Sequence, residues 1–322
     1  MSKLPKLYVG PMSKNVVDSV IEFTQENNVD IGFIPSRRQV ELSGGYVNNW
    51  TTKTFSEYVA GRVLIERDHG GPGQGLFDDD GFDSFVEDSK YFDIVHIDPW
   101  KKINNISTGA LFTSNTIKQL SSKNPDLLFE IGTEESIKKF STQELNQMIS
   151  IIKAGLSSDM FKKIKYCVIQ SGVGLDLASM KNTGTYSEDR LIKMIQVCTS
   201  YGLSSKEHNG DYLTQDQVSQ RFANGLSAIN IAPEFGQIET MCYYNNMDSN
   251  DKQKFYEICL TSGRWKKWVD SSFDPDKNKK DLVRICGHYN FSNESFEKIR
   301  PDISGHVKNE IKNRLKELLI ER

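Results

Sequence analysis

The stretch VLIERDHGGPGQG, residues 63–75, decides the fold. Its first three residues are apolar, charged residues follow at once, and the second half contains four glycines. A short apolar run followed by polar residues and glycine is typical of a buried parallel strand that carries ligand-binding side chains at its carboxyl end. Similar runs recur along the chain and predict eight strands. They are Leu7–Gly10, Asp30–Ile34, Val63–Ile65, Ile94–Ile97, Leu127–Ile131, Tyr166–Ile169, Ser204–Glu207 and Ala228–Ala232.

Segments with helical period separate these strands. Val16–Glu26, Thr142–Ala154 and Asp189–Tyr201 each place apolar residues three and four positions apart. Ser141 stands where it can cap the second of them. Alternating strands and helices favour βα units around a parallel sheet. Eight strands within about 235 residues match the size of a (β/α)8 TIM barrel, and a doubly wound open sheet is the alternative.

The sequence changes character after the eighth strand. Residues 248–322 are rich in lysine and have helical period. Their last segment spaces four apolar residues for one buried face, namely Val307, Ile311, Leu315 and Leu318. We predict an α/β chain in two parts, a barrel over residues 1–247 and a helical C-terminal extension over residues 248–322 that packs on it. We expect His288 and His306, both in this extension, at the surface.

The overall charge argues against a nucleic-acid partner. The 322 residues include 40 basic and 43 acidic ones, which gives a formal net charge of −3. Sequence-independent binding to nucleic acid needs a basic surface that displaces counterions. A small anionic substrate needs only a local cluster of donors, so that class of ligand stays open.

Neither a secretory signal nor a membrane span is expected. The N-terminal MSKLPKLYVG has no long apolar run, and no stretch reaches the roughly 18 apolar residues of a membrane helix. The five cysteines are scattered and lack CxxC spacing: Cys167, Cys198, Cys242, Cys259 and Cys286. They are typical of reduced core thiols, with a cysteine metal site as the alternative. We therefore predict a cytoplasmic protein.

Polar residues follow nearly every predicted strand, and in a parallel barrel they converge on one mouth. The pair Asp68 and His69 is the most specific of them. Because the two are adjacent, we expect one to point into the barrel and the other to lie near the rim. A histidine ligand beside a carboxylate base suits proton removal next to a polarised substrate oxygen. Asp68 is the candidate catalytic residue and His69 a candidate metal ligand, whereas a glycine loop with an incidental Asp-His is the alternative.

His208 follows the seventh strand and is the candidate second ligand. Neutral imidazoles suit zinc, and catalytic zinc takes about three protein ligands and keeps one position open. Our third ligand is Glu134 in EIGTEE, with Asp98, Asp211 and Glu234 as rivals. The alternative for His208 is a hydrogen-bonded histidine at the rim.

Other polar side chains at the mouth are candidates for binding substrate. Arg37 and Arg38 suit phosphate or carboxylate, although one of them can instead form a salt bridge with Glu41 or Glu66. His96 and Asp98 alternate along the fourth strand, so they either orient a ligand or bind substrate. The predicted substrate-binding residues are Arg37, Arg38, Gln39, Asn49, His96, Asp98, Gln170, Asp211 and Glu234.

Six of these segments together resemble the non-catalytic-subunit family of class II tagatose-bisphosphate aldolases, and more broadly the class II, metal-dependent sugar-phosphate aldolases. In the family's order they read SRRQVELSGGYVNNWT, ERDHGGPG, HIDPW, EIGTEE, VIQSGV and EHNGDYLT, and they lie between residues 30 and 236. QVE…GGY and DHGGP are the most specific. The other segments are weak individually, and their order carries the resemblance.

The resemblance implies a (β/α)8 fold and a divalent metal, normally zinc. It also implies that His69 and His208 are metal ligands and that Asp68 handles the proton on the aldehyde-derived hydroxyl. Two departures stand out. The eighth strand, INIAPEFG, offers only Glu234 where the aldolases supply another zinc histidine. The glycine-serine phosphate loops of the family are not recognisable, which argues against a bisphosphorylated ketose.

Our leading hypothesis is a class II-type aldolase that cleaves or forms a C–C bond in a sugar or sugar phosphate through a metal-stabilised enediolate. One alternative is a non-catalytic subunit that stabilises a partner aldolase, as the family name suggests. The other is a metal-dependent sugar epimerase, which uses the same enediolate without cleavage. As partners we expect the small sugar, and either further copies of this chain or a separate aldolase subunit.

Overall fold

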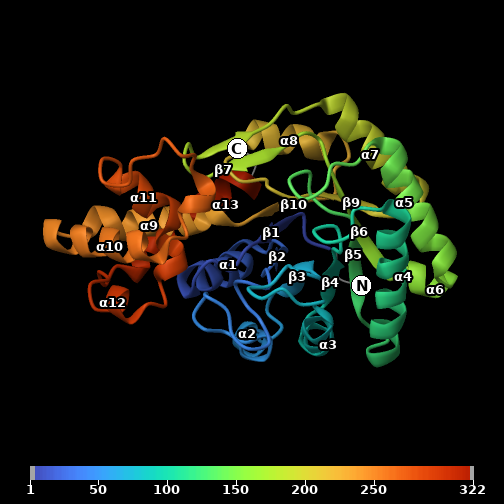
Figure 1. Ribbon diagram of the computed structural model, residues 1–322, viewed down its shortest axis with the longest axis horizontal. Coiled ribbons are helices and arrows are strands. Elements are labelled where there is room, and N and C mark those ends of the chain that lie inside the picture. Colours follow the sequence, from blue (N-terminus) through green and yellow to red (C-terminus); the bar gives the residue numbers. More distant parts are fainter. Residues whose placement is uncertain (1–3, 320–322) are drawn as a thin grey trace.

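A computed structural model describes residues 4–319 of the chain and contains a closed barrel of eight parallel strands (Figure 1). Neighbouring strands follow the order β1-β10-β9-β6-β5-β4-β3-β2. The strands are β1 (Leu7–Val9), β2 (Ile31–Phe33), β3 (Leu64–Gly70), β4 (Ile94–Ile97), β5 (Leu128–Ile131), β6 (Ile164–Ile169), β9 (Ser204–Glu207) and β10 (Ala228–Ile231). Each lies where the apolar runs predicted one. The (β/α)8 barrel is confirmed, and the open doubly wound sheet is wrong.

Helices cover the outside of the barrel between successive strands. They are α1 (Lys14–Asn27), α2 (Thr52–Val59), α3 (Phe82–Tyr91), α4 (Ile106–Lys123), α5 (Thr142–Gly155), α6 (Ser158–Phe161), α7 (Glu188–Ser200) and α8 (Gln215–Ala223). Ser141 caps α5 as predicted, since its side chain accepts a hydrogen bond from the Glu144 N–H and Glu144 bonds back to the Ser141 N–H. None of the described helices is long and apolar enough to cross a bilayer.

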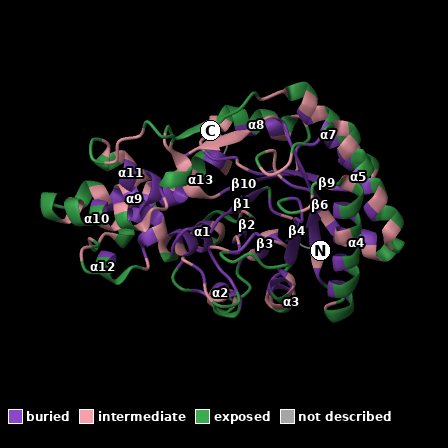
Figure 2. Cartoon of the chain, in the orientation of Figure 1, coloured by how far each residue is buried: buried purple, intermediate pink, exposed green. Residues whose placement is uncertain are grey.

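Two apolar clusters hold the barrel together. The larger one fills the space between strands and helices, where the inner faces of the helices are buried (Figure 2). The smaller one lies inside the barrel and consists of Tyr8, Ile34, Ile94, Tyr166 and Ala228. All five cysteines are buried and free. The interior is therefore packed below the mouth, and a ligand can enter only from the carboxyl ends of the strands.

The helical C-terminal region is present and leaves the barrel after β10 (Figure 1). It comprises α9 (Pro233–Asn246), α10 (Ser249–Ser262), η1 (Lys266–Trp268), α11 (Lys279–Cys286), η2 (Gly287–Asn290), α12 (Glu294–Glu297) and α13 (Ser304–Leu319). Helix α13 returns to contact α1, α8 and α9, so it closes the ring of helices around the barrel. The predicted boundary at residue 247 falls between α9 and α10 and stays a prediction, and residues 320–322 lie outside the described part.

Val307, Ile311, Leu315 and Leu318 form the buried face of α13, as their spacing predicted. His306 is exposed, but His288 is buried, and our surface prediction for His288 is wrong. Its ring packs on Tyr289 with centroids 4.0 Å apart, and the C-terminal helices bury their apolar residues in the same cluster as the helices of the barrel. A hairpin of β7 (Gly174–Asp176) and β8 (Lys181–Thr183) was not predicted, since its residues form no apolar run.

A buried ion pair fixes β3 against its surroundings. The Arg67 guanidinium donates to both carboxylate oxygens of Asp88 in α3, at 2.6 and 2.7 Å, and neither side chain is exposed. It also donates to the carbonyl oxygens of Pro35 and Val40, in the segment after β2. This pair therefore holds in place the two segments that carry the predicted site.

Replacing Asp88 by alanine is expected to destabilise the protein by about 3–5 kcal/mol, because it leaves the Arg67 charge buried without a partner. Urea unfolding followed by circular dichroism measures the change. The matched control is Asp159→Ala, which breaks an exposed ion pair with Lys162 and should cost no more than about 0.5 kcal/mol. Equal effects of the two substitutions would contradict a structural role for the Arg67–Asp88 pair.

Candidate metal centre

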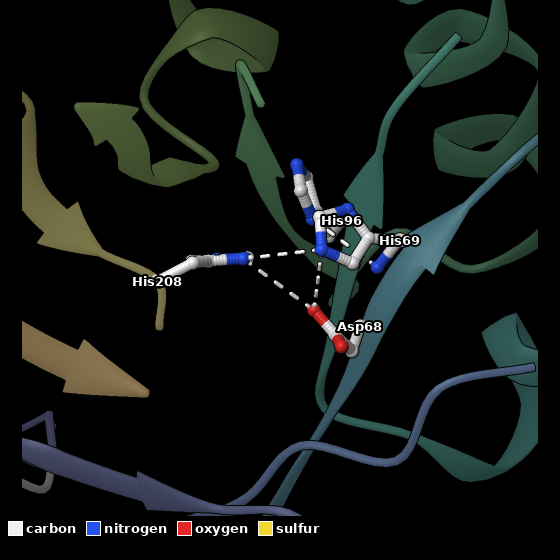
Figure 3. A group of neighbouring side chains, drawn as sticks. All are labelled: Asp68, His69, His96 and His208. Carbon is white, nitrogen blue, oxygen red and sulfur yellow. Dashed lines mark hydrogen bonds and ion pairs between the residues drawn. The ribbon is translucent and has the colours of Figure 1, made fainter. Parts of the chain in front are cut away.

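Asp68 and His69 lie at the end of β3, and both face the barrel mouth (Figure 3). Strand alternation predicted that only one of them would point inward, and this prediction is wrong. The register of β3 on β4 shifts between Arg67 and Gly70, and His69 has a φ of 43°, in the left-handed region. The break in alternation turns two adjacent side chains toward the same point.

Four side chains meet there: Asp68, His69, His96 and His208 (Figure 3). Each offers one ligand atom, and these atoms all lie within 4.8 Å of one another. His69 Nε2 is 3.3 Å from His208 Nδ1 and 3.4 Å from Asp68 Oδ1. His208 Nδ1 is 3.6 Å from Asp68 Oδ1. The fold thus brings together two histidines that are 139 positions apart in the sequence.

Carboxylates hold the other nitrogens of two of these rings. Asp98 Oδ2 lies 2.6 Å from His69 Nδ1, and Glu130 Oε1 lies 2.8 Å from His208 Nε2. A carboxylate that accepts a proton-bearing ring nitrogen fixes the tautomer and leaves the opposite nitrogen as a lone-pair donor. His69 Nε2 and His208 Nδ1 therefore present lone pairs to the same point. Of the two readings that the sequence left for Asp98, its burial and this contact support the orienting one.

His96 is fully buried in β4 and approaches the same point from inside the barrel. Its Nε2 donates to the Gly132 carbonyl oxygen at 3.0 Å, and its Nδ1 accepts a hydrogen bond of 3.3 Å from the His69 backbone N–H, a contact that a bound ion would replace. A ring that donates through Nε2 carries its lone pair on Nδ1. Burial lowers the pKa of His96, which keeps the imidazole neutral. We had expected His96 to orient a ligand or bind substrate, and the structure adds it to the potential ligands.

The spacing of this group fits a divalent ion. Zinc binds histidine nitrogen at about 2.1 Å, so tetrahedral ligand atoms lie about 3.4 Å apart. The 3.3 Å between His69 Nε2 and His208 Nδ1 matches that value, and Asp68 Oδ1 lies beside the same point, 3.4 and 3.6 Å from these two nitrogens. Asp68 Oδ1 is buried and has no hydrogen-bond partner within residues 4–319. Although burial alone lowers the pKa of His69, the carboxylates of Asp68, Asp98 and Glu134 raise it well above its usual range. A positive charge is therefore favoured here, carried either by a proton on Nε2 or by a metal ion that displaces this proton.

A buried charge network beneath the group escaped the sequence analysis. Lys206 Nζ lies 2.6 Å from Glu66 Oε2 and 2.9 Å from Glu130 Oε2, and all three side chains are fully buried. Although burial alone raises the pKa of Glu130, the Lys206 ammonium and two imidazoles of the group hold it well below its usual range. Glu130 is therefore ionised where it contacts His208. The available signal was the presence of charged residues inside three buried strands, Glu66 in β3, Glu130 in β5 and Lys206 in β9.

A cavity of about 310 Å³ opens onto this group, and Asp68, His69 and His208 line it. Four other predicted residues also line it, namely Arg38, Gln39, Glu134 and Asp211. Gln74, Lys101, Asn209 and Lys267 were not predicted, and their wall positions come from loops and from the C-terminal region. Gln74, Lys101 and Asn209 lie in the loops after β3, β4 and β9, beyond the residues that sequence reasoning selected there, and Lys267 comes from a region with no strand.

Glu134, our choice for the third ligand, lies at the edge of the group. Its Oε2 is 3.7 Å from His69 Nε2 and accepts a hydrogen bond from Asn209 Nδ2 at 2.6 Å. Burial alone raises its pKa, but His69 and His208 hold it at about 2. Asp68 and His96, and not Glu134, belong to the four side chains whose ligand atoms lie mutually close.

Asp211 lines the cavity but also has a structural role. Its Oδ1 accepts hydrogen bonds from the backbone nitrogens of Ala232 and Glu234, at 3.1 and 2.8 Å. These groups begin α9, whose own N-cap residue supplies no side-chain bond. Burial raises the pKa of Asp211 to about 8. One carboxylate oxygen of Asp211 thus accepts the hydrogen bonds of the first N–H groups of α9.

Besides His96 and Asp98, which hold the metal group, four residues expected to bind substrate do not line the cavity: Arg37, Asn49, Gln170 and Glu234. The Arg37 guanidinium pairs with Glu41 at 2.6 Å and Asp79 at 2.7 Å, so the salt-bridge alternative describes this arginine. The Glu234 carboxylate pairs with Arg314 of α13 at 2.7 Å, which removes it as a rival metal ligand.

Gln170 and Asn49 serve the backbone. The Gln170 amide donates to the carbonyl oxygens of Thr133 and Lys138 and accepts from the Phe140 N–H, so its hydrogen-bonding capacity is used in joining loops. Asn49 is exposed in a turn with a φ of 51°, a conformation that asparagine tolerates well. Both polar side chains stabilise loops. A polar residue after a strand can do this or bind a ligand, and the sequence pattern is the same in both cases.

Solved structures share this architecture. A protein from Sinorhizobium meliloti 1021, described as a "probable tagatose 6 phosphate kinase", superposes with a TM-score of 0.71 at 15% identity, over 98% of this chain and 89% of its own. The likeness is one of fold. The YdjI aldolase from Escherichia coli K12 gives 0.55 at 9% identity, over 92% of this chain and 90% of its own. The fructose-bisphosphate aldolase (Fba) from Campylobacter jejuni superposes with a TM-score of 0.53 at 11% identity, over 92% of this chain and 91% of its own.

These neighbours agree with the resemblance seen in the sequence segments, since two of them bear aldolase names. No protein-family model matches the chain, and no curated protein matches its sequence.

Proposed function

We propose that this protein is a metal-dependent aldolase that cleaves or forms a C–C bond in a sugar phosphate. The observation that carries the proposal is the convergence of three imidazoles and an unpartnered carboxylate oxygen beside one cavity. The aldolase names of two fold neighbours support it. The donor set favours zinc, because neutral imidazole nitrogens are its usual ligands.

His69, His96 and His208 are the proposed ligands. Three histidines with one position left open form a known catalytic zinc arrangement. His96 is fully buried and is not among the residues that line the cavity, so it suits permanent coordination and not exchange with substrate. Asp68, His69 and His208 line the cavity, so a substrate would reach a bound ion from that side. A bound divalent ion supplies a Lewis acid for the negative charge that develops on the ketone oxygen of the substrate.

Asp68 is the proposed proton-transfer residue. Its side chain lines the cavity and is 20% exposed, whereas those of Asp98 and Glu130 are fully buried behind the histidines. In cleavage, Asp68 takes the proton from the hydroxyl of the fragment that leaves as an aldehyde. The electron pair of the broken C–C bond stays with the ketone fragment, which takes up one proton before it leaves. Glu130 and Asp98 hold the histidines in place throughout.

Products in heavy water distinguish this reaction from its alternatives. The purified chain is loaded with zinc and incubated with a panel of ketose phosphates. Aldehyde and ketone fragments are expected. Deuterium in an intact sugar would instead indicate the epimerase. No turnover alone, together with tight co-purification of a second barrel that turns the sugar over, would indicate the non-catalytic subunit.

The orienting carboxylates lead to a further expected result. Asp98→Asn should weaken zinc binding by about 10–100-fold, because the amide no longer fixes the His69 tautomer. Competition with a chromogenic chelator measures the affinity. Asp126→Asn, at an exposed position before β5, is the control and should bind zinc like the unmodified protein. Unchanged affinity in Asp98→Asn would remove His69 Nε2 from the ligand set.

A further inference from the structure

Three cations from separate segments line the same cavity as the metal group. Arg38 follows β2, Lys101 follows β4, and Lys267 lies in η1 of the C-terminal region. None of them has a carboxylate partner among the described residues. Their sequence neighbours do, because Arg37 pairs with Asp79 and Lys102 pairs with Asp78, each at 2.7 Å. In each of the two neighbouring pairs, Arg37–Arg38 and Lys101–Lys102, the residue that lines the cavity is the one without a salt bridge.

These cations are close enough to affect one another. Desolvation, followed by the charges of Arg38, Arg264 and Lys101, lowers the pKa of Lys267 to about 8. The pKa of Lys101 is also lowered, by desolvation and then by Arg38 and Lys102. Like charges held together without counter-ions repel one another, and a bound anion relieves that cost.

Aromatic contacts hold the C-terminal region against the mouth of the barrel. The rings of Tyr46, after β2, and Tyr289, in η2, lie 5.0 Å apart. Arg264 lies over both rings at 5.3 and 5.4 Å, and Lys267 Nζ lies 5.4 Å from the centre of the Tyr289 ring. The C-terminal region is therefore docked against the barrel mouth, and it delivers a lysine that the barrel alone lacks.

Two of the three cations, Arg38 and Lys267, extend the cavity away from the metal group. A second cavity of about 370 Å³ is lined by Arg38 and Lys267, together with Tyr46, Arg264 and Tyr289, and by none of the four residues of the metal group. The metal end carries the carboxylates of Asp68 and Glu134 instead. The cavity therefore carries negative charge beside the metal group and positive charge where Arg38 and Lys267 lie.

We propose that Arg38, Lys101 and Lys267 form a subsite for the phosphate monoester of the substrate. A phosphate dianion offers three terminal oxygens, which one guanidinium and two ammonium groups from three directions can share. A ligand with a hydroxy-ketone at one end and a phosphate at the other matches the polarity of the cavity. The assignment rests on the proposed function for what binds at the metal end, but phosphate binding is measurable without turnover.

Calorimetric titration of inorganic phosphate into the zinc-loaded full chain tests the subsite. Lys267→Met, Lys101→Met and Arg38→Met are each expected to weaken phosphate binding about tenfold or more, since each removes a charge-assisted hydrogen bond. The matched controls are Lys102→Met, the sequence neighbour of Lys101, and Lys277→Met, an exposed lysine of the C-terminal region. Neither lysine lines either cavity, and both variants should bind phosphate normally. Unchanged affinity in all three subsite variants would overturn the proposal.

Two further measurements separate the subsite from the metal group. His208→Ala should still bind phosphate, and loss of binding there but not in Lys267→Met would place the anion on the metal and overturn the subsite.

In turnover assays, Lys267→Met should raise KM for a phosphorylated sugar and leave KM for its unphosphorylated analogue unchanged. Lys267-dependent phosphate binding without any aldol cleavage would uphold the subsite and contradict the proposed function. Equal binding of acetate and phosphate would contradict the preference for phosphate.

Discussion

Asp68→Asn is expected to lower kcat for aldol cleavage by about 10²–10⁴-fold while the protein keeps its zinc. The amide has nearly the same shape as the carboxylate but cannot accept the hydroxyl proton. The three imidazoles remain in place, because Asp98, Glu130 and the Gly132 carbonyl group hold them independently of Asp68. Steady-state kinetics on the substrate found in the product screen, together with elemental analysis, measure both quantities.

The control for this experiment is Asp83→Asn, an exposed position in the first turn of α3, and it should turn over normally. Two results would contradict the role given to Asp68. Normal turnover by Asp68→Asn would remove it from proton transfer. Loss of zinc would instead make Asp68 a ligand, in line with its distances of 3.4 and 3.6 Å to two imidazole nitrogens.

His69→Ala and His208→Ala are each expected to lose stoichiometric zinc, and with it all measurable turnover. Each removes one of three nitrogen ligands, whereas the orienting carboxylates keep other partners: Glu130 keeps Lys206, and Asp98 keeps the Thr133 hydroxyl. Elemental analysis after dialysis against buffered zinc measures the content, and unfolding curves show whether each variant still folds. His306→Ala, on the exposed face of α13, is the control.

The two single variants should agree, since the account places both rings on one ion. Full zinc content in either of them would exclude that ring as a required ligand. His96→Ala adds a further check, because its ring has no contact with the cavity and can affect turnover only through the metal or through packing.

The barrel was predictable from the sequence because each strand is a buried run bounded by polar residues. Val63–Ile65 and Ile94–Ile97 show this pattern plainly, and the structure has strands there. The same rule located Asp68, His69 and His208, since strand ends in a parallel barrel meet at one mouth. Strand alternation failed at His69, where a register shift and a positive φ cannot be read from residue types.

Other features depend on tertiary contacts that no local pattern records. Arg37 and Arg38 are adjacent and chemically identical, yet one pairs with Asp79 and the other lines the cavity. Lys267 enters the site from a region that the sequence separates from β10 by two helices. Glu130 and Lys206 lie inside the barrel, where a charge is tolerated only because its partners come from other strands.

X-ray absorption spectroscopy of the zinc-loaded protein tests the central claim most directly. The account predicts three imidazole nitrogens at about 2.0–2.1 Å from zinc, with the multiple-scattering signature of histidine rings, and loss of one ring in His208→Ala. A spectrum with only oxygen neighbours, or one that His208→Ala leaves unchanged, would contradict the claim that these histidines share one ion.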